Sequence, residues 1–234
     1  MKQAFAIGYD TNALLDHAKV LAAQFNFIIN NDALPRLQVT AEKLVLLSEN
    51  FSPLHVDFTP QTLQRRRDEG KKQGLVRACK PGKGLRILDA TAGWGRDAAV
   101  LASFGADVLM LERQPMMAAL LSDALAHADN RLQLSLRHID AHSYLQDLPP
   151  DEYPDVIYID PMHPLRQKSA LVKKDMQVLQ NLFGADNDAQ ALIELAKMRV
   201  RQRVVVKWPQ RLPALIPPGF SLDGKTVRFD VYQA

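Results

Sequence analysis

Four apolar segments that alternate with helical patterns limit the folds open to this chain more than any other feature. They end at Leu88, Leu111, Leu136 and Ile159. Strands that are separated by helices form a parallel sheet with right-handed crossovers. The chain from residue 85 onward therefore predicts an α/β domain in which helices cover a parallel sheet.

The C-terminal part predicts a different ending for this sheet. Residues 203–207 are expected to form a fifth strand, which Trp208 and Pro209 interrupt. Residues 219–222 and 226–232 flank an Asp-Gly turn, a dipeptide typical of β-hairpins. We therefore expect a Rossmann-like, mostly parallel seven-stranded sheet that ends in an antiparallel hairpin.

The first 84 residues lack this alternation and predict two smaller parts before a main domain at residues 85–234. Residues 1–60 are expected to form a small N-terminal α/β subdomain, with strands near 5–9 and 25–29, a helix near 12–24 and a hairpin from 37–39 and 44–47. Residues 61–84 form a basic connecting segment, in which Arg65, Arg66 and Arg67 are candidates for contacts with phosphates. Such a charge run also fits a solvated helix face, so both interpretations stay open.

Acidic residues follow the predicted strands of the main domain. Asp89, Glu112 and Asp160 come directly after a strand, and Asp140 lies within a few residues of another. A single acidic residue at such a position is most often a helix cap. Because the carboxyl ends of parallel strands meet at one edge of the sheet, where ligands of such folds bind, four of them together favour a ligand site.

A glycine-containing turn, Asp89-Ala90-Thr91-Ala92-Gly93-Trp94-Gly95-Arg96-Asp97, follows the first of these strands. Glycine adopts backbone angles closed to other residues and lets a ligand approach the main chain closely. The turn lacks both the third glycine of a dinucleotide-binding fingerprint and the Gly-Lys-Ser/Thr of a P-loop. By itself the turn fits a ligand site or an ordinary structural turn.

The ordered set of strands, turn and carboxylates resembles the class I S-adenosylmethionine-dependent methyltransferases. The resemblance implies that the turn holds the methionine moiety of S-adenosyl-L-methionine through Asp89, Ala90, Gly93, Gly95, Arg96 and Asp97. Glu112 is implied to bind the ribose hydroxyls, because a carboxylate accepts two vicinal hydroxyl hydrogen bonds. Asp140 and Ala141 are implied to bind the adenine. Arg113 either flanks the cofactor or is exposed.

A second motif, Asp160-Pro161-Met162-His163-Pro164, resembles the Asp/Asn-Pro-Pro-aromatic motif of methyltransferases that modify exocyclic amines. Such an amine is a poor nucleophile because its lone pair is conjugated into the ring. Asp160, which the resemblance also places at the cofactor, and a main-chain carbonyl would accept the two N–H bonds and free the lone pair. Pro161 belongs to this motif, and His163 takes the place of the aromatic residue that stacks on the base. Catalysis would then rest on alignment and electrostatics.

The resemblance becomes narrower in the segment Gln167-Lys168-Ser169-Ala170-Leu171-Val172-Lys173-Lys174. Together with the motifs above, this segment resembles the RsmJ family of ribosomal small-subunit RNA guanine-N2 methyltransferases, over the chain from about Val56 onward. The family implies methylation of one guanine amino group in 16S rRNA of the small ribosomal subunit. A helix near 167–183 would present Lys168, Lys173 and Lys174 to RNA phosphates.

Other functions are weighed against this one. The triplet His138, Asp140 and His142 could ligate a metal, but the cofactor explains Asp140 and no zinc signature accompanies it, so no metal is expected. Ser143 and Ser169 lack a base and an acid in a nucleophilic arrangement. Two alternatives stay open: a methyltransferase acting on another amine in DNA, protein or a small molecule, and a non-catalytic RNA-binding assembly protein.

Composition indicates where the protein acts. The chain of 234 residues is 47% hydrophobic and 24% charged, as in ordinary globular proteins, and no apolar run is long enough to span a bilayer. The single cysteine, Cys79, fits a reducing compartment. We therefore expect a cytoplasmic protein without a membrane partner. Its net charge of +3 and pI of about 9.0 give a mild bias toward anionic partners.

Overall fold

The computed structural model describes residues 5–128, 131–162, 177–178, 182–184 and 186–234. A seven-stranded sheet forms its larger part and has the strand order β10-β11-β9-β8-β5-β6-β7. The strands are β5 (Arg86–Asp89), β6 (Asp107–Glu112), β7 (Leu134–His138), β8 (Val156–Ile159), β9 (Arg203–Pro209), β10 (Phe220–Asp223) and β11 (Val227–Gln233). Strands β5 to β9 are parallel, and β11 is antiparallel to both β9 and β10. The mostly parallel sheet with an antiparallel hairpin is therefore confirmed.

Two strands of the large sheet, β7 and β9, differ from their expected bounds by two residues. Strand β7 begins at Leu134, two residues after the predicted start. The interruption predicted at Trp208 and Pro209 is wrong, because β9 continues through both residues and pairs there with β11. Strand β8 offers β9 no partner beyond Val206, so the missing N–H of Pro209 costs no ladder bond on that side.

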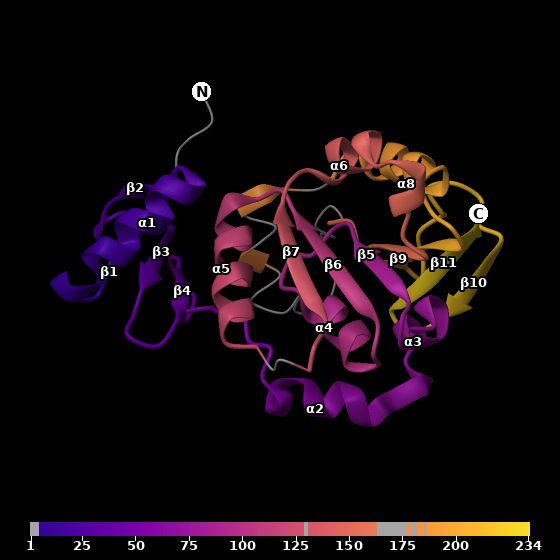
Figure 1. Ribbon diagram of the computed structural model, residues 1–234, viewed down its shortest axis with the longest axis horizontal. Helices are drawn as coiled ribbons and strands as arrows, with labels where there is room; N and C mark the ends of the chain where they lie inside the picture. The colour runs from indigo at the N-terminus through magenta and orange to yellow at the C-terminus, as the bar shows by residue number, and fades with distance from the viewer. Residues whose placement is uncertain (1–4, 129–130, 163–176, 179–181, 185) are drawn as a thin grey trace.

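Helices cover both faces of this sheet. One face carries α3 (Gly74–Cys79), α4 (Arg96–Ser103) and α5 (Pro115–Ala126), and the other carries α6 (Ala141–Asp147) and α8 (Ala189–Lys197). The alternation of side chains along β8 explains the two cores, since Tyr158 packs with the first group while Ile157 and Ile159 pack with the second. The result is a three-layer α/β sandwich (Figure 1).

The N-terminal part has its own four-stranded sheet, in the order β2-β1-β3-β4. It consists of β1 (Ala6–Tyr9), a short 3-10 turn (Asn12–Leu14), α1 (Leu15–Phe25), β2 (Ile28–Ile29), β3 (Arg36–Val39) and β4 (Leu44–Leu47). The hairpin of β3 and β4 is confirmed, whereas the strand expected near 25–29 is shorter because Phe25 still belongs to α1. Figure 1 shows this part lying against α5.

The connecting segment forms α2 (Pro60–Glu69), which packs on α4, and a 3-10 turn (Gly70–Lys72) before α3. Another 3-10 turn, Pro150–Glu152, precedes β8. The helix expected near 167–183 lies largely outside the described residues. In the part of the chain that the structure describes, no helix is long and apolar enough to cross a membrane.

Candidate functional site

A cavity of about 550 Å³ lies where β5, β6, β8 and β9 end. This is the sheet edge at which parallel α/β folds bind ligands, and the volume is in the range of small-molecule sites. Eleven of the residues predicted to bind cofactor or substrate line it: Asp89, Ala90, Gly93, Arg96, Asp97, Glu112, Arg113, Asp140, Ala141, Asp160 and Pro161. Residues far apart in the sequence therefore meet in one cavity.

The two glycines of the turn have different surroundings. Gly93 has a φ of 53° and lines the cavity, and its N–H donates to Oε2 of Glu112 at 3.0 Å. Gly95 has a φ of 66°, but it is absent from the described lining of the cavity. A Cβ at Gly95 would lie 2.8 Å from both Phe58 and Leu121. Gly95 thus allows close packing of the turn onto the core, whereas the expectation for it was contact with a ligand.

Two carboxyl groups at strand ends are deeply buried. Asp89 is 1% exposed and accepts a hydrogen bond from the backbone N–H of Thr91 at 3.1 Å. Burial raises the pKa of Asp89 to about 8, and nearby carboxylates add to this effect. Glu112 accepts the N–H of Gln114 at 2.7 Å, and burial raises the pKa of Glu112 to about 7. Both groups therefore favour a ligand that is cationic or donates hydrogen bonds.

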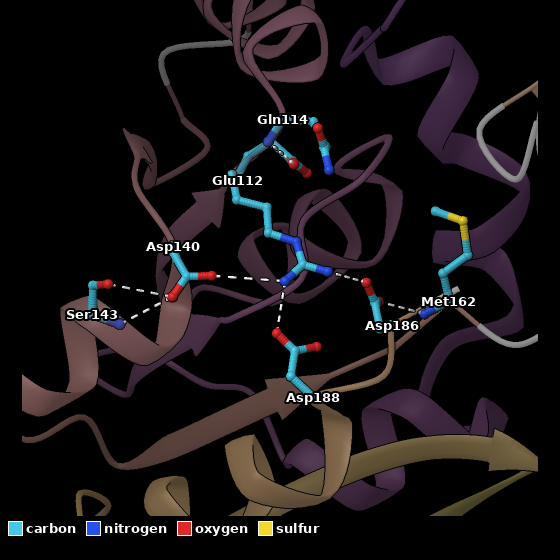
Figure 2. A network of polar contacts seen from close by, with 8 residues as sticks. Glu112, Gln114, Asp140, Ser143, Met162, Asp186 and Asp188 are labelled. Carbon is cyan, nitrogen blue, oxygen red and sulfur yellow. Dashed lines mark hydrogen bonds and ion pairs between the residues drawn. The ribbon is translucent and has the colours of Figure 1, made fainter. Parts of the chain in front are cut away.

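Arg113 pairs with three carboxylates, and these residues, Asp140, Asp186 and Asp188, are labelled in Figure 2. Its guanidinium lies 2.7 Å from Asp188 and 3.7 Å from Asp140, and it also contacts Asp186. Asp140 in addition caps α6 by accepting the N–H of Ser143 at 3.1 Å. Of the two alternatives for Arg113, the structure supports a position beside the cofactor cavity, where its charge is paired.

Asp186 connects this network to the second motif. Its Oδ2 accepts the N–H of Met162 at 2.7 Å, and its own N–H donates to the carbonyl of Met162 at 2.9 Å (Figure 2). Asp186 thus binds both the N–H and the C=O of Met162, and fixes the main chain directly after Asp160 and Pro161. The sequence analysis did not single out Asp186 or Asp188, because they precede α8 rather than follow a strand.

Asp160 lies in a second polar cluster. The ammonium of Lys207 lies 2.6 Å from Oδ2 of Asp160 and 3.0 Å from Oδ2 of Asp97. The hydroxyl of Tyr158, which is 1% exposed, donates to the same oxygen of Asp97 at 2.6 Å. The backbone N–H of Asp160 donates to the hydroxyl of Thr91 at 2.6 Å. Sequence reasoning missed Lys207, although a cation at the end of the predicted fifth strand was a signal for it.

Several predicted residues are not tested by this geometry. His163, Lys168, Lys173 and Lys174 lie outside the described residues. Arg65, Arg66 and Arg67 belong to α2, but their side chains are outside the described part.

The triplet His138, Asp140 and His142 was weighed as a metal site, and no metal was expected there. The ring of His138 packs against that of Phe25, with centroids 5.4 Å apart, and Asp140 faces Arg113. Across the described ranges of the chain, no group of three or more histidine, cysteine, aspartate or glutamate side chains could hold a metal ion.

The charges around the cavity fit a cationic ligand. Seven carboxylates line it, against three arginine or lysine side chains: Asp89, Asp97, Glu112, Asp140, Asp160, Asp186 and Asp188, against Arg96, Arg113 and Lys207. S-adenosylmethionine carries a sulfonium and an ammonium, which match such a surplus of negative charge. Trp94 lines the same cavity with its side chain buried, and its indole N–H lacks a hydrogen-bond partner in the described part of the protein. The residues present therefore fit this cofactor.

Comparisons with known proteins agree with this geometry. A family model described as SAM-dependent methyltransferase matches residues 20–234. The chain is 58% identical to ribosomal RNA small subunit methyltransferase J of Legionella pneumophila strain Lens, over 99% of this chain and 97% of the relative. It is 41% identical to the protein of the same name in Cellvibrio japonicus, over 92% of each chain.

Solved structures show the same fold. A SAM-dependent methyltransferase of Neisseria gonorrhoeae superposes with a TM-score of 0.73 and 28% identity, over 97% of this chain and 95% of the other. A 16S rRNA N2 guanine methyltransferase of T. thermophilus, solved with AdoMet and guanosine, gives a TM-score of 0.51 at 22% identity, over 82% of this chain and 47% of the other. This second likeness concerns the fold alone.

Proposed function

This chain belongs to the SAM-dependent methyltransferase family and, within it, to the ribosomal RNA small subunit methyltransferase J proteins, and we therefore propose that it methylates the exocyclic N2 amine of a guanine in 16S rRNA. One observation carries the proposal. Asp160, the acidic residue of the amine-directed motif, lines the same cavity as Asp89 and Glu112 of the cofactor motifs. An amine bound at Asp160 would therefore lie close to a cofactor bound at the turn.

The cofactor is held along the sheet edge by groups from successive strands. S-adenosylmethionine supplies an electrophilic methyl group on a sulfonium sulfur, and transfer of this methyl leaves a neutral thioether. The turn from Asp89 to Asp97 binds the methionine moiety, Glu112 the ribose, and Asp140 with Ala141 the adenine. The oxygens of Glu112 already accept two backbone N–H groups, but each carboxylate oxygen has a second acceptor site for a ribose hydroxyl.

The amine is activated by alignment rather than by a covalent intermediate. Asp160 accepts one N–H of the guanine N2 amine, and a main-chain carbonyl of the motif accepts the other, so the lone pair points at the methyl group. The N2–CH₃ bond would form as the S–CH₃ bond breaks, and the proton that leaves the amine would pass to solvent water. Because the reacting atoms lie in a cavity, the target base is unstacked, with His163 against its face.

Contacts with the rRNA backbone would come from two basic segments of the chain. Lys168, Lys173 and Lys174 follow the motif in the sequence, and Arg65, Arg66 and Arg67 belong to α2. These cations bind phosphates and position the small subunit without selecting a base. The protein acts in the cytoplasm, where ribosomal subunits are assembled.

Transfer of labelled methyl to the small ribosomal subunit tests the proposed function. Subunits that lack their native guanine-N2 methylations are incubated with labelled S-adenosylmethionine and the protein, and nucleosides are then analysed. The wild type is expected to produce N2-methylguanosine. Asp160→Ala is expected to lower the rate by about 10²-fold or more, as when a preorganised polar group is removed from an active site.

Other outcomes separate the alternatives. Label in DNA, protein or a small amine, but not in rRNA, would contradict the rRNA substrate and keep the methyl transfer. Binding of the subunit that is equal in wild type and Asp160→Ala, with no transfer to any acceptor, would favour a non-catalytic assembly protein.

A further inference from the structure

Lys207 contacts Asp160 through its ammonium group. Its ammonium bridges Oδ2 of Asp160, at 2.6 Å, and Oδ2 of Asp97, at 3.0 Å. These two carboxylates come from different motifs, since Asp97 closes the cofactor turn and Asp160 begins the amine-directed motif. Lys207 itself belongs to β9, the strand next to β8. One side chain thus links the two halves of the cavity.

We propose that Lys207 is a positioning residue for methyl transfer, which fixes the carboxylate of Asp160 for the target amine and couples it to the cofactor turn. This inference rests on the proposed function. Lys207 acts through Asp160 and Asp97 and does not itself react with the methyl group or the amine.

The charges at this point of the cavity require a cation. Asp89 from β5, Asp97 from α4 and Asp160 after β8 lie close enough that Asp97 and Asp160 both raise the pKa of Asp89. Without the ammonium of Lys207, the carboxylates of Asp97 and Asp160 repel each other more strongly, which favours an Asp160 that turns toward solvent or takes up a proton. A protonated or displaced Asp160 loses its ability to accept the amine N–H. Lys207 therefore stabilises the arrangement that the reaction needs.

Lys207 cannot serve as the base that removes the amine proton. Burial by itself lowers the pKa of Lys207, but Asp160 and then Asp97 more than offset this effect and raise it above its ordinary value. The side chain consequently stays an ammonium at neutral pH, with no lone pair to offer. The side chain of Lys207 is 27% exposed and lines the cavity.

The backbone of Asp160 is already fixed independently of Lys207. Its N–H donates to the hydroxyl of Thr91, and Met162 two residues later is held by Asp186. A change at Lys207 therefore alters the direction of the Asp160 carboxylate more than the course of the chain. A partly exposed ion pair contributes little to stability, so the protein is expected to remain folded without it.

Steady-state kinetics of two variants test the proposal, with Lys207→Met removing the charge and Lys207→Arg keeping it. Lys225→Met serves as the control, because Lys225 is an exposed lysine in the β10–β11 turn. Lys207→Met is expected to lower kcat by at least about tenfold, since misplacement of one group in an active site has such an effect. Binding of S-adenosylmethionine, measured by calorimetry, is expected to change by less than about threefold. Lys207→Arg is expected to recover part of kcat, and Lys225→Met to match the wild type.

The pH profile separates positioning from a merely structural role. Among the described residues, the charged and titratable groups near Asp160 include Asp89, Asp97, Tyr158 and Lys207, from β5, α4, β8 and β9. Loss of the cation favours protonated Asp160, so the acid limb of the rate profile of Lys207→Met is expected to move to higher pH. An unchanged kcat and an unchanged acid limb in Lys207→Met would overturn the inference.

A readout without cofactor or substrate completes the test. Melting temperatures are measured for Lys207→Met, Asp160→Asn and the double variant. The changes in melting temperature of the two single variants are expected not to add up to that of the double variant, because the two side chains contact each other. Additive shifts would contradict the direct link. An inactive wild type, by contrast, would overturn the proposed function and with it the role of Lys207 in that reaction.

Discussion

Two carboxyl groups, Asp89 and Glu112, lie in the cavity with pKa values raised into the neutral range, to about 8 and about 7. In the protein without ligand, each is therefore partly protonated at neutral pH. Burial is the main cause, because a charged carboxylate loses its hydration there. A ligand that brings an ammonium, a sulfonium or hydroxyl donors reverses this preference and favours the ionised forms.

Binding of S-adenosylmethionine is accordingly expected to release protons near pH 7, and its affinity is expected to rise as the pH increases from 6 to 8. Calorimetry in buffers with different ionisation enthalpies counts the protons released. Glu112→Gln, which cannot ionise, is expected to release fewer of them. Equal heats in all buffers would show that the ligand does not change the ionisation of these groups.

The same shifts affect the stability of the protein without ligand. The pKa of Asp89 is raised from 3.8 in the unfolded chain to about 8, so the folded state holds its proton more tightly. Its contribution to stability is thus present below pH 4 and is lost as the pH rises toward 8. Part of the binding energy of a cationic ligand compensates for this loss.

Several secondary-structure elements meet at Arg113, which follows β6 directly. Of its three carboxylate partners, Asp140 directly precedes α6, and Asp186 and Asp188 lie just before α8. Asp186 in turn holds Met162 after β8. Arginine presents several donors in a fixed planar arrangement, which suits a bridge between three carboxylates better than a single ammonium does.

Arg113→Lys is therefore expected to weaken S-adenosylmethionine binding by about three- to tenfold, the range for loss of one ordinary hydrogen bond, while the protein stays folded. Calorimetric titration and a melting curve check this. Arg137→Lys is a matched control. Arg137 belongs to β7, lies over the ring of Tyr144 in α6 and is outside the described lining of the cavity. Equal affinities in the two variants would show that the Arg113 network does not support the cofactor site.

The whole molecule combines two sheets around one shared helix. The N-terminal sheet packs on α5, and the backbone N–H of Leu44 donates to Oδ2 of Asp123 in that helix at 2.9 Å. Buried residues of both parts belong to one continuous apolar core. Because the two parts share a core, we expect them to unfold together.

A single calorimetric transition is expected for the entire chain. Leu46→Ala, at a position 1% exposed in the N-terminal sheet, is expected to destabilise the whole protein by about 2–5 kcal/mol, as large-to-small changes in a core do. Val20→Ala, at a position 62% exposed in the same part, is the control and is expected to have little effect. Two transitions, with only one of them shifted by Leu46→Ala, would show that the parts fold independently.

The sequence by itself determined the local features of this protein. The apolar segments separated by helical patterns and the Asp-Gly turn are properties of short stretches of sequence. They predicted the parallel sheet, its hairpin ending and the edge on which Asp89, Glu112 and Asp160 lie. The family followed from motifs of the same kind. Strand ends were less certain, as Pro209 shows, because pairing with a neighbouring strand overrides a local preference.

Only the tertiary structure decided which side chains meet. Lys207 lies 47 residues from Asp160 and 110 from Asp97 in the sequence, and Arg113 lies 73 residues from Asp186. Such contacts depend on strand order and on the packing of loops, which no local pattern records. The structure also shows that Gly93 lines the cavity whereas Gly95 packs against Phe58, although both belong to one turn. Periodicity places a residue at an edge of the sheet, but its partners are fixed by the close packing of the whole chain.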